Sequence, residues 1–309
     1  MFAGSMVTST GSGLAVPDWP LSYGTLFPPM VGGVFYEHGH RMVASLVGFL
    51  TLILAIWLNL KEKRKWVRIL GFCALGAVIL QGVLGGITVL FFLPTPISVL
   101  HGILAQSFLL MTIMIAYSQS VERKEKTSAV MPGHKTAFVQ MMAILVITVY
   151  VQLIIGAVMR HTNSGLAIPD FPTMGGRWVP LFDQPMLENI NSWRFENDFD
   201  PVSIPQVFVH FAHRVTALII LVQVCFLISY GLKYYRKQKN IFNNIFLLSS
   251  AVIVQIFLGV VTVLTKKLPL VTSLHVVNGA VVLSYSFLLL LRNSPNGYAE
   301  FKELLCKRK

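Results

Sequence analysis

Four histidines stand at matching places in the two halves of this 309-residue chain. His40 and His213 each precede an arginine, and His101 and His275 each follow a Gln-x-x-Leu-Gly-x-x-Thr-Val segment. His101 and His275 are 174 residues apart, and His40 and His213 are 173 apart. Neutral imidazole is the commonest side-chain metal ligand in proteins. Two such pairs in the same order therefore indicate two similar sites that bind a metal.

The elements that must position these histidines are membrane helices. The chain is 54% hydrophobic and only 12% charged, whereas soluble domains carry roughly 25% charged residues. An apolar run of about 20 residues crosses the hydrocarbon core, and in lipid it closes its backbone hydrogen bonds as a helix. The runs are too continuous for the alternating strands of an outer-membrane barrel. They predict seven complete spans, near residues 37–60, 67–92, 97–119, 136–160, 206–231, 241–265 and 270–291.

The net charge of +12 predicts how these spans are oriented. Most lysines and arginines lie in segments that alternate with connections poor in basic residues: 61–68, 120–135, 233–239 and 292–309. The positive-inside rule places these segments, and with them the C-terminus, in the cytoplasm. The sequence therefore predicts a multi-pass protein of the plasma membrane, with its histidine pairs near the outer face. The basic excess needs no nucleic-acid partner to explain it.

Self-similarity extends beyond the histidines. Residues 13–20, Gly-Leu-Ala-Val-Pro-Asp-Trp-Pro, return at 165–172 as Gly-Leu-Ala-Ile-Pro-Asp-Phe-Pro. We therefore expect an all-α integral membrane protein built from two parallel-repeat four-helix bundles, with sites between facing helices. On this eight-span plan, residues 1–8 match the outer end of the span 136–160. They are expected to be the end of a first span that is truncated in this sequence.

The same plan divides the chain into four parts. The expected parts are an N-terminal half at 1–119, a cytoplasmic linker at 120–135, a C-terminal half at 136–292 with an outer loop at 161–205, and a cytoplasmic tail at 293–309.

Each half offers two imidazoles at the same depth. All four histidines lie near the outer starts of their spans, at levels that agree to within about a turn at 1.5 Å per residue. Two histidines on facing helices at one level are the arrangement that a haem iron with two axial histidines requires. A lone intramembrane histidine is more often a hydrogen-bonding residue between helices. Four at equivalent positions favour ligation, and the lack of accompanying thiolates or carboxylate clusters favours haem over zinc or copper.

The two halves differ in the residue three positions before the first histidine of each pair. Glu37 precedes His40, and His210 precedes His213. Residues at i and i+3 share a helix face, so Glu37 points toward one site only and is a candidate for proton transfer. The alternative is a helix-terminal residue or a salt-bridge partner of Arg41.

Several arginines are candidates for binding haem propionates, because carboxylates pair well with the guanidinium fork. Arg41 and Arg214 directly follow the first ligand of each pair, and they could equally extend to the membrane interface. Three further candidates lie near the long outer loop, namely Arg160, Arg177 and Arg194.

These motifs together resemble the haem A synthase family, the membrane enzymes that convert haem O to haem A for cytochrome oxidase assembly. The resemblance covers nearly the whole chain. It rests on segment 8–20, on Glu37-x-x-His40-Arg41, on His101, on segment 161–170, on His210-x-x-His213-Arg214 and on His275.

The resemblance implies a role for each half. His40 and His101 match the axial ligands of the substrate haem, and Glu37 matches the acidic residue assigned to catalysis. His213 and His275 match the ligands of a resident haem b that passes electrons. The implied reaction oxidises the ring-D methyl group of haem O to the formyl group of haem A by successive hydroxylations.

The resemblance also raises expectations about partners and one departure. It implies that the chain contacts lipid, haem O and haem A. Its candidate protein partners are a haem O synthase, an electron donor and further copies of the chain. Many family members carry a cysteine pair in the first outer loop, whereas Val16-Pro17-Asp18 stands there in this chain.

Two other functions are alternatives to a haem A synthase. A non-enzymatic di-haem b-type membrane cytochrome for electron transfer explains both histidine pairs, but not a carboxylate in one half alone. A transporter would place its polar groups near the bilayer midplane, whereas those of this chain gather near the outer face.

Overall fold

The computed structural model describes residues 1–125 and 134–294 of the chain. Within these residues, seven helices are long and apolar enough to cross a membrane. They are α2 (Gly33–Lys61), α3 (Lys65–Leu90), α4 (Thr95–Gln119), α6 (His134–His161), α8 (Ile204–Tyr234), α9 (Lys239–Leu264) and α10 (Pro269–Asn293). Each of the seven predicted spans is found, with ends that differ by a few residues. The predicted all-α membrane fold is therefore confirmed.

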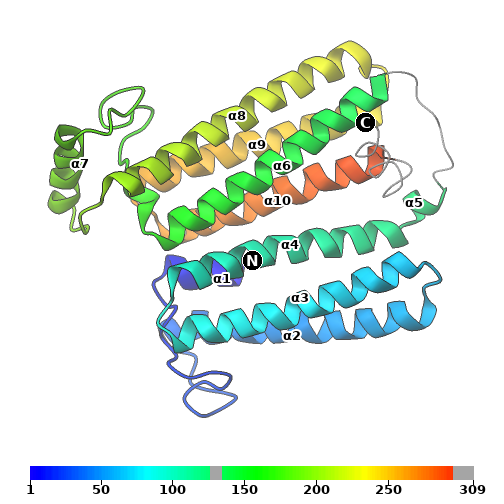
Figure 1. Cartoon of the computed structure of the whole chain (residues 1–309), viewed down its shortest axis with the longest axis horizontal. Helices are drawn as coiled ribbons and strands as arrows, with labels where there is room; N and C mark the ends of the chain where they lie inside the picture. The colour runs from blue at the N-terminus through cyan, green and yellow to red at the C-terminus, as the bar shows by residue number, and fades with distance from the viewer. Residues whose placement is uncertain (126–133, 295–309) are drawn as a thin grey trace, which may run out of the picture.

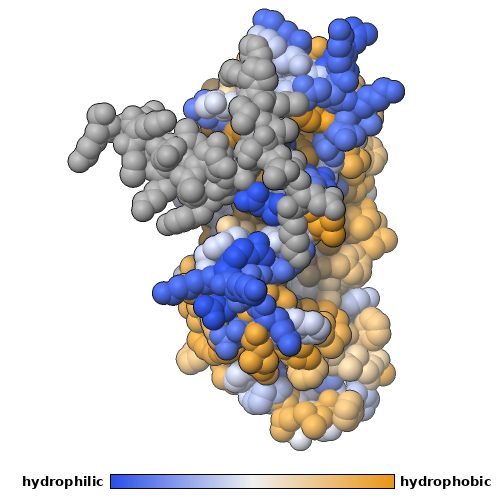
Figure 2. Space-filling view, turned by 90° about the vertical axis from the view of Figure 1, so that its right-hand side faces the viewer, coloured by the Kyte–Doolittle hydropathy of each residue, from blue (hydrophilic) through white to orange (hydrophobic). Residues whose placement is uncertain are grey.

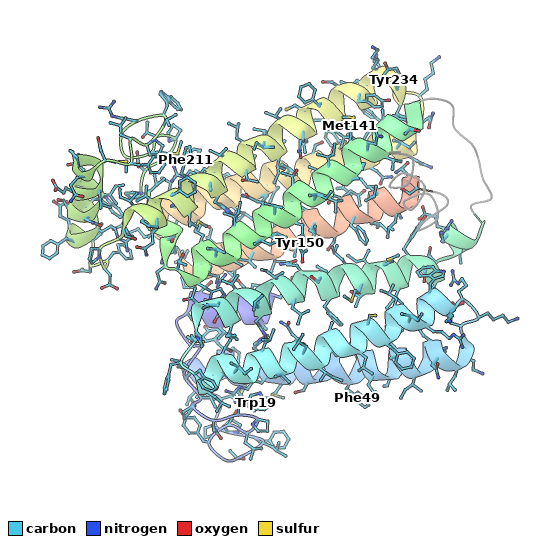
Figure 3. All side chains as sticks on the ribbon, viewed as in Figure 1. Trp19, Phe49, Met141, Tyr150, Phe211 and Tyr234 are labelled. Atoms are coloured by element: carbon cyan, nitrogen blue, oxygen red, sulfur yellow. The ribbon has the colours of Figure 1, made fainter. Side chains whose placement is uncertain are left out.

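The membrane helices form two groups that lie side by side (Figure 1). The short helix α1 (Phe2–Ser9) packs against α2 and belongs with α2, α3 and α4 to the first group, and α6, α8, α9 and α10 form the second. The groups meet where α4 packs against α6 and α10, and where α1 packs against α10. A hydrogen bond of 2.6 Å joins the hydroxyl groups of Ser107 on α4 and Tyr150 on α6 across this contact (Figure 3).

The two ends of the molecule differ in character. The long loops 10–32 and 162–203 both lie at the same end of the molecule, at the lower left and the upper left of Figure 1 respectively. The opposite end carries the α2–α3 and α8–α9 turns, and Figure 2 shows hydrophilic side chains gathered there between apolar flanks. Those flanks carry exposed aromatic side chains such as Phe49, which points away from the bundle in Figure 3. An apolar outer surface of this kind suits contact with lipid tails.

We call the end with the long loops the outer end of the molecule and the opposite end the inner end. Each group of helices has a close-packed apolar core at its inner end. The largest core cluster of the second group joins the inner halves of α6, α8, α9 and α10, with Met142, Leu248 and Leu283 fully buried. A smaller cluster around Leu58 and Val67 does the same for the first group. Apolar side chains fill the inner halves of both groups, so a cavity can lie only in their outer halves.

The outer loop 161–205 has structure of its own. It contains the 3-10 turn η1 (Ser164–Leu166) and the helix α7 (Gln184–Glu196), whose N-cap Asp183 accepts a hydrogen bond from the backbone N–H of Met186. Met186 and Ile190 on α7 pack against Ile168, so the loop folds over the second group. Of the predicted linker, the helix α5 (Val121–Glu125) is described. The rest of the linker at 126–133 and most of the predicted tail, at 295–309, lie outside the described residues.

Candidate functional site

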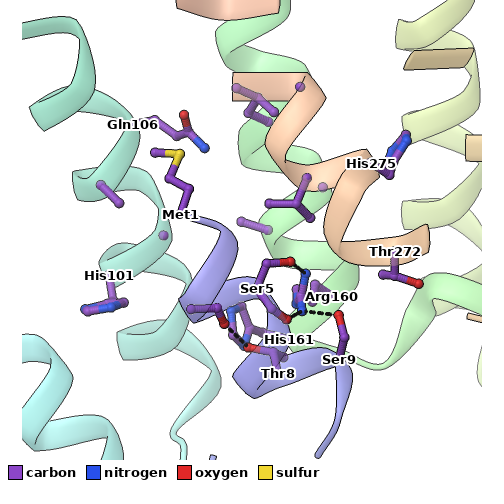
Figure 4. A pocket seen from close by; sticks show the side chains of 18 of the residues that line it. Met1, Ser5, Thr8, Ser9, His101, Gln106, Arg160, His161, Thr272 and His275 are labelled. Atoms are coloured by element: carbon purple, nitrogen blue, oxygen red, sulfur yellow. Dashed lines mark hydrogen bonds between the residues drawn. The ribbon is translucent and has the colours of Figure 1, made fainter. Parts of the chain in front are cut away.

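A cavity of about 2090 Å³ occupies the outer halves of both groups. Ordinary ligand pockets measure about 300–1,000 Å³, so this space is large enough for more than one bulky ligand. All four predicted ligands line it, and so does Glu37. Figure 4 shows His101 on α4 and His275 on α10 on opposite sides of α1.

In the second group, the rings of His213 and His275 face each other. Their centroids are 6.4 Å apart, and their planes are inclined by 61°. Imidazole nitrogen lies about 2.0–2.1 Å from a bound metal in zinc sites, and similar bonds on both sides of one iron would set the ring centres roughly 6 Å apart. The observed spacing therefore fits one metal ion between the two rings.

The nitrogens of these two rings differ in their contacts. Nδ1 of His275 lies 3.2 Å from the carbonyl oxygen of Gln255, and a backbone acceptor at one nitrogen is what fixes the other toward a metal. The Gln255 amide also approaches both ring nitrogens of His275 at 3.3 Å. Nδ1 of His213 is buried without a hydrogen-bond partner. Among the described residues, no group of three or more His, Cys, Asp or Glu could hold a metal ion.

Glycines on neighbouring helices support all four rings. A Cβ added to Gly4 or Gly156 would lie within 3.3 Å of the Cε1 atom of His40 or His213, respectively. Gly85 and Gly259 contact His101 and His275 in the same way, at 3.4 and 3.0 Å. The glycines therefore let each imidazole lie directly on a helix backbone. Because Gly4 serves His40 as Gly156 serves His213, α1 takes the place in the first group that the outer end of α6 takes in the second.

Three glutamines fix the backbone beneath the histidines. The amide of Gln81 donates to the carbonyl oxygen of His101 at 3.0 Å, and that of Gln255 donates to His275 at the same distance. Gln152 on α6 donates to the carbonyl oxygen of His213 at 2.9 Å. Gln81 and Gln255 are matching residues of the repeat, but the sequence alone indicated no role for them. Each lies 20 residues before a histidine, and this equal spacing is the pattern that could have linked them to the histidines.

Glu37 and His210 perform the same structural task. One oxygen of Glu37 accepts the backbone N–H of Val16 at 2.8 Å, and the other pairs with Arg41 at 2.6 Å. Nδ1 of His210 lies 3.2 Å from the backbone nitrogen of Ile168 and Nε2 lies 3.2 Å from Nε of Arg214, and a neutral imidazole can accept one of these two N–H groups. The salt bridge weighed as the alternative for Glu37 is therefore present. It leaves the carboxylate buried, at the wall of the cavity.

The two arginines hold the outer loops. Arg41 donates to the carbonyl oxygens of Asp18 and Leu21, each at 2.7 Å. Arg214 donates to those of Thr173 at 3.1 Å and Ile168 at 2.9 Å. Both arginines also line the cavity. Several of their N–H donors are committed to the loops, and their predicted role toward propionates stays a prediction.

The Arg41 fork gives a testable effect on loop stability. Replacement of Arg41 by lysine keeps the charge but cannot reproduce a fork that reaches several carbonyl oxygens. Hydrogen bonds to charged groups contribute about 1.5–3 kcal/mol, so loop 10–32 should be cut by protease at least about tenfold faster in Arg41→Lys. Arg236→Lys, at an exposed position of the inner end, should leave the rate unchanged. Equal rates in the two variants would contradict this role.

Acidic residues shape the two loops in the same way. Asp18 accepts the backbone N–H groups of Gly24 and Tyr23, which lower the pKa of its carboxyl group. Asp170 accepts those of Gly175 and Gly176. Burial raises the pKa of Asp170, but these bonds and the Thr173 hydroxyl outweigh it, and the net pKa is lowered. The first loop then places the Trp19 ring against Gly86 at the cavity wall, as a cap over the bundle.

Comparison with known proteins agrees with this architecture. The COX15-CtaA family, described as cytochrome oxidase assembly protein, matches residues 32–287. A protein of Lysinibacillus sphaericus (strain C3-41) named heme A synthase is 28% identical over 305 residues, which cover 96% of this chain and 92% of that protein. A Bacillus licheniformis protein of the same name is 31% identical over 277 residues, covering 86% of this chain and 82% of its own.

The fold and the site define a helical membrane protein with two histidine pairs related by an internal repeat. The chain belongs to the COX15-CtaA family of cytochrome oxidase assembly proteins. The family resemblance predicted from the motifs is thereby confirmed.

Proposed function

We propose that this protein is a haem A synthase, an oxidoreductase that converts the ring-D methyl group of haem O to the formyl group of haem A. The observation that carries the proposal is the close pair of histidines His213 and His275, with His40 and His101 at the repeat-equivalent positions of the same cavity. Membership of the cytochrome oxidase assembly family and the names of the relatives support it.

In the first group, His40 and His101 would hold the substrate iron and so fix which edge of the macrocycle meets the wall. In each of two hydroxylations the methyl carbon would gain an oxygen atom and lose two electrons to an oxidant from outside the chain, and the resulting gem-diol would lose water to become the aldehyde. Glu37 is the carboxylate available for moving a proton beside that edge, because it lies at the cavity wall three residues before His40. Its hold on Val16 keeps the outer loop closed over the site and limits the entry of water.

In the second group, His213 and His275 would hold haem b. When bound, haem b supplies a one-electron carrier within the same cavity as the substrate. The residues of the chain keep that position fixed: Gly156 and Gly259 support the rings, and Gln255 orients His275. The contacts between the two groups bring the two sites into one protein interior.

The same proposal includes a place in the cell and partners. The hydrophilic end seen in Figure 2 would face the cytoplasm under the positive-inside rule, with the cavity near the outer face of the plasma membrane. A haem O synthase would supply the substrate, and a separate electron donor or acceptor would complete the redox balance. Further copies of the chain are a candidate partner.

The test is extraction and mass analysis of haem from cells that express the protein with and without a haem O synthase. We expect haem A or its hydroxylated precursor only when haem O is supplied. A variant with both His40 and His101 replaced by alanine should yield haem O and haem b but no oxidised product. The competing function is a di-haem electron-transfer cytochrome, which the shared structural task of Glu37 and His210 favours. Recovery of unmodified haem alone from the intact protein would support that function and overturn the synthase.

A further inference from the structure

The two halves of the cavity differ in charge at their outer mouths. The turns that follow α3 and α9 have the same backbone form, with positive φ at Leu93 (60°) and at Lys267 (66°). Leu93 lies against Gly13, and Lys267 lies against Gly165, at 3.3 and 3.4 Å from an added Cβ. An ammonium group in the second half therefore takes the place of an isobutyl group in the first.

A second cation, Arg160, lines the same cavity and lies close enough to Lys267 to lower the pKa of its ammonium group. Arg160, in the last turn of α6, occupies the position that Thr8 occupies in α1, since the loops that follow are offset by the same 152 residues. Arg160 donates to the carbonyl oxygen and hydroxyl group of Ser5 and to the hydroxyl group of Ser9, as Figure 4 shows. All three acceptors are neutral, and three bonds leave two of the five N–H donors of a guanidinium group.

These cations lack an anionic partner among the residues that the structure describes. The ion pairs found there involve neither Arg160 nor Lys267. Burial lowers the pKa of Lys267, and the nearby Arg194 and Arg160 lower it further. Arg194 is itself committed to the carbonyl oxygens of Asp200 and Leu166. Two like charges at the edge of an apolar cavity are costly unless an anion joins them.

The neighbouring lysine does not share this position. Lys266 is exposed, and its ammonium group donates to the side chain of Asn197 at 2.6 Å. Its counterpart in the first half is Phe92, which has nearly the same φ. Lys266 also borders the cavity, but its ammonium group is turned to Asn197, so it serves as a control for the removal of a positive charge from this turn.

We propose that Arg160 and Lys267 form a carboxylate-binding mouth that retains the propionate groups of the haem in the second half. The equivalent positions of the first half, Thr8 and Leu93, carry no charge, so its haem is held less firmly and can exchange. The proposal deepens the proposed function, because it explains which of two similar sites keeps its ligand and which releases a product. Charge-assisted hydrogen bonds from both cations supply the retention.

The experiment measures how fast purified protein that carries haem loses it to an excess of apomyoglobin. We expect Lys267→Leu, which installs the residue of the first half, to release the haem held by two histidines about tenfold faster than the intact protein. Lys267→Arg should restore slow release, and Lys266→Phe should have no effect. Equal release from Lys267→Leu and the intact protein would overturn the proposal, as would equal acceleration by Lys266→Phe.

A second measurement identifies the chemical group that is bound. Protein reconstituted with haem dimethyl ester, whose propionates are masked, should release it at the same rate with Lys267 or with leucine. A difference that persists with the ester would show that Lys267 acts through folding, and the proposal would fail. If the intact protein retains no haem under any condition, the proposed function fails instead, so the two failures are distinguishable.

Discussion

Replacing His213 with alanine is expected to abolish the absorption spectrum of a haem with two axial histidines. His213 and His275 face each other at 6.4 Å between ring centres, so the loss of one ring leaves the iron with a single protein ligand. Even residues that only orient metal ligands change affinity by about 10- to 100-fold, so haem content should fall by at least about tenfold. The measurement is absorbance per mole of purified protein, oxidised and reduced.

The repeat supplies the matched variant for this prediction. His101→Ala removes the equivalent ligand from the first group and should leave the spectrum of the second intact, while it stops oxidation of the substrate. His161→Ala removes a cavity histidine that has no equivalent partner, and it should retain the spectrum and the haem content. If His101→Ala removes the signal and His213→Ala leaves it unchanged, the assignment of the resident haem to the second group is wrong.

The sequence predicted the membrane helices and the histidine pairs because both depend on local patterns. Twenty apolar residues specify a span in any context, and equivalent residues of a repeat lie at equivalent depths. Contacts between elements could not be read in this way. The bond from Val16 to Glu37 joins residues 21 positions apart through a folded loop, and neither residue type indicates it. The helix α7 was also missed, since its 13 residues lie in a polar loop.

The repeat also shows where the two halves differ in charge. The offset of 174 residues that aligns His101 with His275 also aligns Leu93 with Lys267, and the offset of 152 that aligns the outer loops aligns Thr8 with Arg160. The structure gives these differences meaning by placing both cations at one cavity. Arg160 was a propionate candidate from its position alone, whereas Lys267 looked like an ordinary residue of a short outer turn. Its burial against Gly165 distinguishes it from Lys266.

Replacing Glu37 with histidine is expected to separate the structural task of this residue from its chemistry. His210 already shows that an imidazole at this position fits between a loop N–H and an arginine N–H and can accept one of them. Glu37→His should therefore keep the outer loop closed and retain haem at His40 and His101. General acid–base catalysis contributes about 10²- to 10⁴-fold, so formation of hydroxylated haem or haem A should fall by at least about a hundredfold.

Three measurements decide what the Glu37→His result means. Protease resistance of loop 10–32 reports the structural task, haem content reports binding, and mass analysis of extracted haem reports oxidation. Glu196→His, at an exposed position of α7, controls for the loss of a carboxylate on the same side of the membrane. If oxidation continues at the rate of the intact protein while the loop stays closed, Glu37 serves only to hold Val16 and Arg41, and the proton transfer must use another group. If oxidation stops and the loop opens, Glu37→Gln provides the decisive comparison, because its amide oxygen can still accept the N–H of Val16 without carrying a charge.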